Sequence, residues 1–511
     1  MSIIKALSGV IGAVLLSACS VMPAAFERAE IQETAVQDLA LVAASQDPLD
    51  DILTLEGAMA RAIKYNLENR LQLMRTSLAG RNFEMVKMDM LPLLNASAGH
   101  TSRNNYDASR SYNVTQGTET TDYTTSSERK HSTFDARLVW SVLDFGVSYL
   151  AAKQEGYRFL VDDLTRKKTI ITLLEQVRTQ FWRAATMQKI RRELENLLVD
   201  AERTFTNLQK VRADALSPRR QVLEDIRTLA EIVQQLEKMH QIADLATIEL
   251  GALINEPFDK PVSVLAPAQL PMVPDFKMDL EKMELIALMN STDYVSEMYN
   301  VKIDQMESRK ALLRLLPGLE FSYGFNYDNN RYLYNNSWTE AGVRVSYNVF
   351  QLLAADEIMA HNDAREQVAL NRRLMTNVAT LTKTHLSWQN YQNARKRYER
   401  SEYIGDIDAQ IADLTGMARA SKKVSGVEKI KTDARAMRSL MGRMQSYVDV
   451  QSSYGSFLMT LGVNPVPKNY QQLDLKQLSE AMHSFSIGVD SEALQKLTLN
   501  SPGEPVADST L

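Results

Sequence analysis

The stretch that decides the fold runs from Leu316 to Asn330 and reads LPGLEFSYGFNYDNN. Aromatic residues occupy every second position, and small or polar residues fill the positions between them. The aromatic residues are Phe321, Tyr323, Phe325 and Tyr327. A period of two places successive side chains on opposite faces of a β-strand. The stretch therefore predicts a strand with one aromatic face and one polar face.

Three other segments alternate in the same way. We expect strands at about 93–102, 132–143, 318–328 and 339–350. Each has about ten residues, the length that crosses a bilayer when a strand is tilted. Apolar side chains toward lipid and polar ones toward a lumen form the pattern of a membrane barrel. A soluble antiparallel sheet with one wet face is the alternative. The residues that we expect to face lipid are Trp140, Phe321, Tyr323, Phe325, Tyr327 and Tyr347.

Long helices join these strands. From Tyr157 to Ser217 the chain has neither Gly nor Pro, and apolar residues recur at spacings of three and four. A helix of this kind would be roughly 100 Å long, and it must pack along other long helices in a coiled-coil-like bundle. The helices expected from this pattern lie at about 148–212, 218–252, 351–414 and 426–462.

The chain also repeats itself. Residues 140–143 (WSVL) match residues 347–350 (YNVF) at an offset of 207, and Phe181 matches Trp388 at the same offset. Asn66 pairs with Asn290 at an offset of 224, so the first half carries an insertion, which falls in the polar segment Thr101 to Lys130. This segment either caps the outer end or lies in solvent. The expected division is a first repeat at 51–257, a linker at 258–279, a second repeat at 280–465, and a C-terminal segment with a mobile tail at 466–511.

The N-terminus predicts export. A short basic start and an apolar run lead to Leu16-Ser17-Ala18-Cys19, so we expect a signal peptide at 1–18. These last four residues resemble a bacterial lipobox, in which the cysteine becomes the lipidated first residue. Cys19 would then begin a lipidated tether at 19–50. Ordinary cleavage beside an incidental cysteine is the alternative. Cys19 is the one cysteine in the sequence, which excludes an intramolecular disulfide.

Composition excludes other classes. The 511 residues carry a net charge of −5 without a basic tract, which argues against a nucleic-acid partner. Charged residues make up 24%, too many for a polytopic helical membrane protein. The histidines are scattered, and no phosphate loop, nucleophile elbow or dinucleotide fingerprint is present. We therefore expect no enzyme activity, no catalytic residue, no cofactor and no metal.

Four strands cannot close a membrane barrel. An open sheet edge in lipid leaves unpaired N–H and C=O groups, each costing several kcal/mol. The smallest membrane barrels have about eight strands. Copies of the chain must therefore combine. Two copies would give a tight barrel of eight strands, and three would give twelve strands, wide enough for a lumen.

The ordered set of features resembles the TolC-type outer-membrane factor family over about residues 50–470. The features are the tandem halves, Thr54-Leu55-Glu56 opening the first helix, Leu91-Pro92 before the first strand, and residues 140–146 (WSVLDFG) leaving the second. The resemblance implies a mainly α protomer that contributes to a membrane β-barrel, with a homotrimer forming twelve strands and a periplasmic α-helical tunnel. Such proteins are passive exit ducts of tripartite efflux pumps or type I secretion systems in the outer membrane of Gram-negative bacteria. Their partners are a periplasmic adaptor, an inner-membrane transporter and outer-membrane lipid.

The resemblance also places a periplasmic mouth at two helix-to-helix turns, Arg212 to Gln221 and Thr415 to Glu428. Family members can carry acidic rings there, but this sequence has Lys429 and Thr432 at the two matching positions. Three luminal copies of Lys429 would favour anions; solvated charges or interhelix salt bridges are the alternative. The mouth candidates are Glu224, Asp225, Glu428, Lys429, Thr432 and Asp433. The adaptor-contact candidates, which are otherwise solvated turn residues, are Arg219, Arg220, Lys422 and Lys423.

A function from another class also fits a lipidated, mainly helical chain. A lipid-anchored periplasmic or surface scaffold could be built from a coiled coil with a small sheet. The duplicated aromatic strands favour the duct, because a scaffold does not need lipid-facing aromatic residues in two places.

Overall fold

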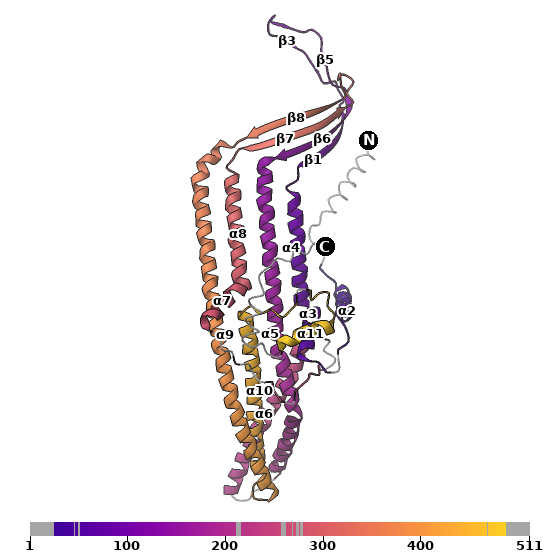
Figure 1. Cartoon of the computed structure of the whole chain (residues 1–511). Helices are drawn as coiled ribbons and strands as arrows, with labels where there is room; N and C mark the ends of the chain where they lie inside the picture. Colours follow the sequence, from indigo (N-terminus) through magenta and orange to yellow (C-terminus); the bar gives the residue numbers. More distant parts are fainter. Residues whose placement is uncertain are drawn as a thin grey trace, which may run out of the picture.

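The molecule is elongated, with a four-stranded sheet at one end of a row of long helices (Figure 1). The structure is a computed structural model, and it describes residues 25–44, 46–49, 52–210, 216–256, 262–267, 269–271, 275, 279–467 and 469–486. Two similar halves follow each other, each running from short helices through two strands into two long helices. The predicted tandem protomer of four strands and long helices is confirmed.

The two halves contain corresponding elements. Those of the first half are α3 (Leu55–Tyr65), α4 (Leu67–Met88), β1 (Leu93–Ser102), β6 (Lys130–Ser141), α5 (Val142–Gln209) and α6 (Leu216–Ile254). Those of the second half are α7 (Leu280–Asn290), α8 (Thr292–Leu313), β7 (Gly318–Asp328), β8 (Ser337–Ser346), the 3-10 helix η1 (Val349–Ala354), α9 (Ala355–Ala420) and α10 (Gly426–Thr460). Outside the repeats lie α2 (Arg28–Ala44) and α11 (Leu475–Ser486). The loop between β1 and β6 holds four short strands, β2 (Ala108–Ser109), β3 (Tyr112–Asn113), β4 (Thr118–Glu119) and β5 (Thr124–Thr125).

The four long strands form one antiparallel sheet in the order β1-β6-β7-β8. Each half therefore contributes one hairpin, and the two halves join where β6 meets β7. The register at this junction aligns Trp140 with Phe321 and Leu138 with Tyr323. β1 and β8 are the outer strands, and one edge of each pairs with no other described strand.

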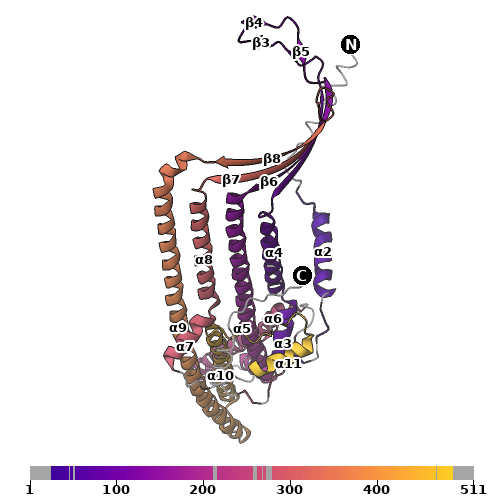
Figure 2. The same cartoon turned by 45° about the horizontal axis from the view of Figure 1, so that its top comes forward.

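Four helices lie side by side below the sheet, in the order α4, α5, α8 and α9 (Figures 1 and 2). α5 has 68 residues and α9 has 66, so each is about 100 Å long at 1.5 Å per residue. Farther from the sheet, α5 packs on α6 and α9 packs on α10, while α10 also contacts α5. Helices of this length are stable because they bury one another along the bundle.

Aromatic packing ties the long helices together at the level of α3 and α7. Trp182 of α5 meets Tyr447 of α10 edge-on, with ring centroids 5.3 Å apart. In the second half, Tyr391 of α9 stacks on Phe457 of α10 at 6.1 Å. Burying one such ring contributes about 1.5–3 kcal/mol, so the first contact holds α5 and α10 together across the two helix pairs and the second holds α9 on α10.

Both hairpins of long helices end in the same helix stop. Asn255 follows α6 with φ of 60°, and Gly462 follows α10 with φ of 71°. In each case the next N–H bonds to the carbonyl five residues back, at 2.9 and 3.1 Å. This is a Schellman motif. Glycine is also required at 462 by packing, because a Cβ there would lie 2.3 Å from the Cβ of Asn290.

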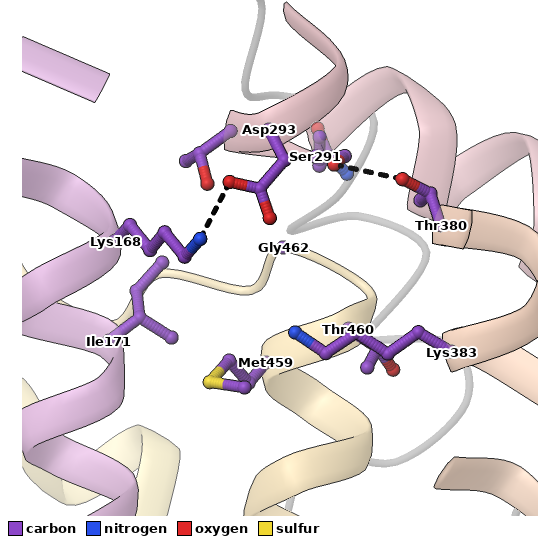
Figure 3. A pocket seen from close by; sticks show the side chains of 11 residues that line it. Lys168, Ile171, Ser291, Asp293, Thr380, Lys383, Met459, Thr460 and Gly462 are labelled. Carbon is purple, nitrogen blue, oxygen red and sulfur yellow. Dashed lines mark hydrogen bonds and ion pairs between the residues drawn. The ribbon is translucent and has the colours of Figure 1, made fainter. Parts of the chain in front are cut away.

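A cavity of about 50 Å³ lies where α8 begins against α5, α9 and the end of α10 (Figure 3). Lys168 of α5 pairs with Asp293 in the first turn of α8 at 2.7 Å. The hydroxyl oxygens of Ser291 and Thr380 lie 3.5 Å apart. An acidic residue in the first turn is favoured by the helix dipole, so these contacts fix the start of α8 against the long helices.

The strands end earlier than the alternation predicted. β6 stops at Ser141 and β8 at Ser346, instead of at 143 and 350. The Ser141 hydroxyl accepts the backbone N–H three residues on, at 3.2 Å. Asn348, 207 residues after Ser141, accepts the N–H two residues on at 3.2 Å. These caps turn the chain into helical structure. Tyr347 therefore lies outside the strand, and its prediction as a strand residue was wrong.

Candidate functional site

One face of the sheet is aromatic and apolar. The register places five of the six residues predicted to face lipid on this face, and they are Trp140, Phe321, Tyr323, Phe325 and Tyr327. Their exposed fractions range from 38% to 55%, which is high for large apolar side chains. Trp140 stacks on Phe321 with 6.2 Å between centroids. A contiguous apolar patch of this kind needs a cover of lipid or protein.

The opposite face is polar. Arg137 on β6 and Glu340 on β8 approach to 3.9 Å across the intervening strand β7. The crossed position is Gly324, where an added Cβ would lie 3.7 Å from the Arg137 Nε. Glu320 and Arg344 stand opposite each other on the same face, nearer the helices. A sheet with one apolar and one charged face has the character of a membrane barrel wall.

A hydrogen-bonded row crosses the polar face near the loops. With the Asn326 amide oriented to satisfy both of its neighbours, the Trp338 Nε1–H donates to Asn326 Oδ1 and Asn326 Nδ2 donates to Asp135 Oδ1, each at 3.1 Å. The Ser97 hydroxyl reaches Asp135 Oδ2 at 3.3 Å. The sequence interpretation missed Trp338 because it began the fourth strand at 339, whereas β8 begins at Ser337. The available signal was that Trp338 lies two positions before Glu340, so the strand's alternation places both side chains on the polar face.

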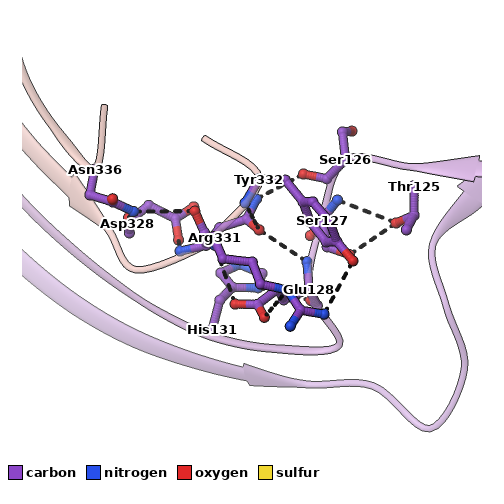
Figure 4. A network of polar contacts seen from close by, with 10 residues as sticks. Thr125, Ser126, Ser127, Glu128, His131, Asp328, Arg331, Tyr332 and Asn336 are labelled. Carbon is purple, nitrogen blue, oxygen red and sulfur yellow. Dashed lines mark hydrogen bonds and ion pairs between the residues drawn. The ribbon is translucent and has the colours of Figure 1, made fainter. Parts of the chain in front are cut away.

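A polar network joins the two loops beyond the sheet (Figure 4). Asn330 is buried, and its Nδ2 donates to the Ser126 carbonyl at 2.8 Å while its Oδ1 accepts the Glu128 N–H at 3.2 Å. The Glu128 carboxylate pairs with Arg331 at 3.0 Å. The loop after β7 thus fixes the base of the inserted segment. That segment extends away from the sheet as an arm, opposite to the helices (Figure 1).

At the far end of the molecule, an ion pair joins α6 and α10. Lys431 Nζ lies 3.2 Å from Asp225 Oδ1, and both side chains are partly buried. Glu224 instead pairs with Arg220 on its own helix, at 2.9 Å. Of the two predicted mouth residues on α6, Asp225 forms the ion pair with α10. Its partner Lys431 was not singled out from the sequence.

The four mouth candidates on α10 have different surroundings. Lys429 pairs with Asp433 one turn along the same helix. Thr432 is buried, and its hydroxyl donates to the Glu428 carbonyl at 2.9 Å. Glu428 is exposed. Within one chain, the Lys429 charge therefore has a carboxylate beside it, and Thr432 faces the packed interior.

The comparisons with known proteins agree with this architecture. No protein-family model and no curated protein matches the sequence. The Campylobacter jejuni CmeC outer-membrane channel matches with a TM-score of 0.63 and 11% identity, over 84% of this chain and 90% of its own. The open-state MtrE outer-membrane channel of Neisseria gonorrhoeae gives 0.62 and 12%, over 82% and 94%. The outer-membrane protein VceC of Vibrio cholerae gives 0.59 and 12%, over 80% and 96%. The chain has the TolC-type fold.

The predicted adaptor-contact residues lie at the ends of the long helices that are farthest from the sheet. Lys422 has a left-handed φ of 59°, and the Lys423 N–H bonds to the Ala418 carbonyl at 2.9 Å, so the turn after α9 is a Schellman motif. The side chains of both lysines are exposed, as are those of Arg219 and Arg220. Residues 211–215 of the first turn lie outside the described residues.

Cys19, the predicted lipidation residue, also lies outside the described residues. Within the described ranges, none of the helices combines the length and the apolar character needed to cross a membrane. The same ranges hold no group of three or more His, Cys, Asp or Glu side chains arranged to bind a metal ion.

Proposed function

We propose that three copies of this chain form an outer-membrane channel that serves as the exit duct of an export system. The observation that carries the proposal is the sheet, which has an exposed aromatic face, a charged face and two open edges. In lipid, each unpaired edge group would cost several kcal/mol. Pairing β8 of one copy with β1 of the next removes both edges, and three copies supply twelve strands around a polar lumen.

The outer helices support the same closure. α4 lies at one end of the row of helices, and its buried Asn69 and Thr76 are on the side toward α5. The opposite side carries a stripe of apolar residues that are 49–65% exposed, namely Leu67, Leu71, Met74, Leu78, Met85 and Met88. α9, at the other end of the row, also exposes large apolar residues, including Leu374 and Val378. Packing α9 of one copy on α4 of the next would bury both surfaces.

In this proposal the helices project into the periplasm, and the duct conducts passively between a periplasmic adaptor and the exterior. An inner-membrane transporter supplies the energy. The six mouth candidates lie at the periplasmic end, and the basic turns contact the adaptor. Cys19 carries a lipid that anchors each copy to the outer membrane. The architecture fits both a tripartite efflux pump and a type I secretion system.

The deciding experiment is the native mass of the protein extracted from outer membranes in mild detergent. We expect a trimer. Leu71→Glu combined with Leu78→Glu should reduce it to monomers, because carboxylates would be placed in the apolar stripe. Leu71→Met combined with Leu78→Met, which keeps the stripe apolar, is the matched control and should leave the trimer intact. A monomeric Cys19→Ala variant that leaves the membrane without detergent would refute the duct and favour a lipid-tethered scaffold.

A further inference from the structure

Trp338 departs from the pattern of the polar face. In the four long strands, the other residues on this face are small, polar, charged or aliphatic, apart from His131. Trp338 is 43% exposed although it is one of the largest side chains on the sheet. It lies at the start of β8, next to the loop that fixes the arm. In the proposed barrel, three copies would form a ring of indoles just below the outer opening.

The Trp338 indole is hydrogen-bonded through its N–H edge. Its Nε1–H is bound to Asn326, which is itself bound to Asp135, at 3.1 Å in both cases. These bonds orient the ring along the row of side chains that crosses the strands. Because they use the N–H edge, these bonds do not cover the π-face of the ring, and 43% of Trp338 is exposed. The negative face of an indole attracts cations, most strongly among the aromatic side chains.

Three carboxylates lie on the polar face in the same row as Trp338 or in an adjacent row. Asp135 belongs to the row of side chains aligned with Trp338 across the strands. Asp328 belongs to the next row toward the loops, and Glu340 to the next row toward the helices. Arg137 pairs with Glu340 at 3.9 Å. Asp135 and Asp328 accept hydrogen bonds from uncharged groups, which leave their charges in place. The surroundings of the indole are therefore net negative in each copy, and three copies focus that charge into one lumen.

We propose that Trp338, with Asp135 and Asp328, forms a weak binding site for organic cations at the outer end of the lumen. The favoured ligand class is an aromatic or quaternary ammonium compound, which combines cation–π contact with attraction to carboxylates. The inference rests on the proposed function, because this face lines a lumen only in the closed barrel. A weak site suits an exit, since conduction requires that a bound ligand also leaves.

The test uses the full-length protein in planar bilayers, with benzyltrimethylammonium added on the side of the arm. The measured quantity is the concentration that halves the conductance. We expect Trp338→Ala to raise it about tenfold, as loss of a cation–π contact predicts, and Trp338→Phe to raise it less. Phe325→Ala, on the opposite face of the neighbouring strand, should leave it unchanged. Benzyl alcohol, a neutral probe with the same ring, should block no better in the native protein than in Trp338→Ala.

A second measurement distinguishes failure of the cation-site proposal from failure of the channel proposal. In intact cells, a membrane-impermeant maleimide should label the thiol of the Trp338→Cys variant and leave that of Phe325→Cys unlabelled. Labelling of this kind together with equal block in the native protein and Trp338→Ala overturns the cation site and leaves the channel standing. Equal protection of both thiols means that the polar face does not line a lumen, and it overturns the channel and the site together.

Discussion

Lys431 of α10 and Asp225 of α6 form an ion pair at 3.2 Å that joins the two return helices near the turns. The pair is partly buried, so solvent screens it less than a fully exposed pair. It connects residues 206 positions apart, one from each half of the chain. In the proposed duct, this contact fixes the position of one helix hairpin relative to the other at the periplasmic end.

Removing the Asp225 charge should loosen that end. We expect Asp225→Asn to speed hydrogen exchange over residues 426–432 about fivefold, which corresponds to about 1 kcal/mol for a pair of this exposure. The double change Asp225→Lys with Lys431→Asp should restore slow exchange. Glu224→Gln, which breaks an ion pair within α6 alone, is the control. Unchanged exchange in Asp225→Asn would show that the pair does not hold the hairpins together.

The helix stop at Gly462 predicts an asymmetry between the two halves. Gly462→Ala should destabilise the protein by about 3 kcal/mol, because a Cβ there meets Asn290 and the backbone φ is positive. Asn255→Gly at the corresponding stop should change stability by less than about 1 kcal/mol, since glycine adopts this φ without strain. Thermal unfolding of the detergent-solubilised protein measures both. A cost of only about 1 kcal/mol for Gly462→Ala would show that the φ requirement, and not contact with Asn290, governs the site.

Residue periodicity was enough to predict the duplicated architecture. Alternation identified all four long strands, and the offset of 207 between Ser141 and Asn348 relates two residues whose side chains each cap the helix that follows. The ends of the strands were harder to predict. The side chains of residues 142 and 349 continue the alternation, although the caps have already turned the backbone out of the strand. Trp338 was missed for a related reason: it stands beside a loop, where few residues remain to establish the period.

The candidate mouth was harder to predict than the fold. The sequence gives helical phase within α10, so it could relate Lys429 to Asp433 by spacing. It does not give the rotation of α10 against α6, which depends on packing along the whole bundle. The contact between Lys431 and Asp225 therefore emerged only from the structure.

Asp163, on α5, should make the stability of the protein sensitive to acid. Burial raises the pKa of this carboxyl, but hydrogen bonds from Arg166 at 2.6 Å and Lys167 at 2.9 Å outweigh it, so the pKa lies below its usual value. A lowered pKa in the folded state adds stability above the unfolded value of about 3.9, and that stability is lost as the pH falls through the folded value.

The Asp163→Asn variant tests this dependence. We expect it to be less stable than the native protein by about 1–2 kcal/mol at pH 7, because it loses charge-assisted hydrogen bonds. The difference in melting temperature should shrink as the pH is lowered from 5 to 2. Glu84→Gln, which removes an exposed pair with Lys87, should show little difference at any pH. A difference for Asp163→Asn that persists at pH 2 would contradict the assignment.

The two faces of β7 predict opposite responses to the same new charge. Tyr323 lies on the aromatic face between Leu138 and Ala341, and Ser322 lies on the polar face beside Gly342. If the aromatic face meets lipid, Tyr323→Lys costs about 2–4 kcal/mol per copy near the middle of the bilayer, and three copies multiply that cost. We expect it to remove the oligomer from outer membranes, while Ser322→Lys leaves the amount of oligomer unchanged because its ammonium group reaches the aqueous lumen.

Native gel analysis of outer-membrane extracts measures both variants at matched expression. Loss of the oligomer in Ser322→Lys with normal assembly of Tyr323→Lys would invert the two faces, and equal tolerance of both would show that this sheet does not enter the membrane.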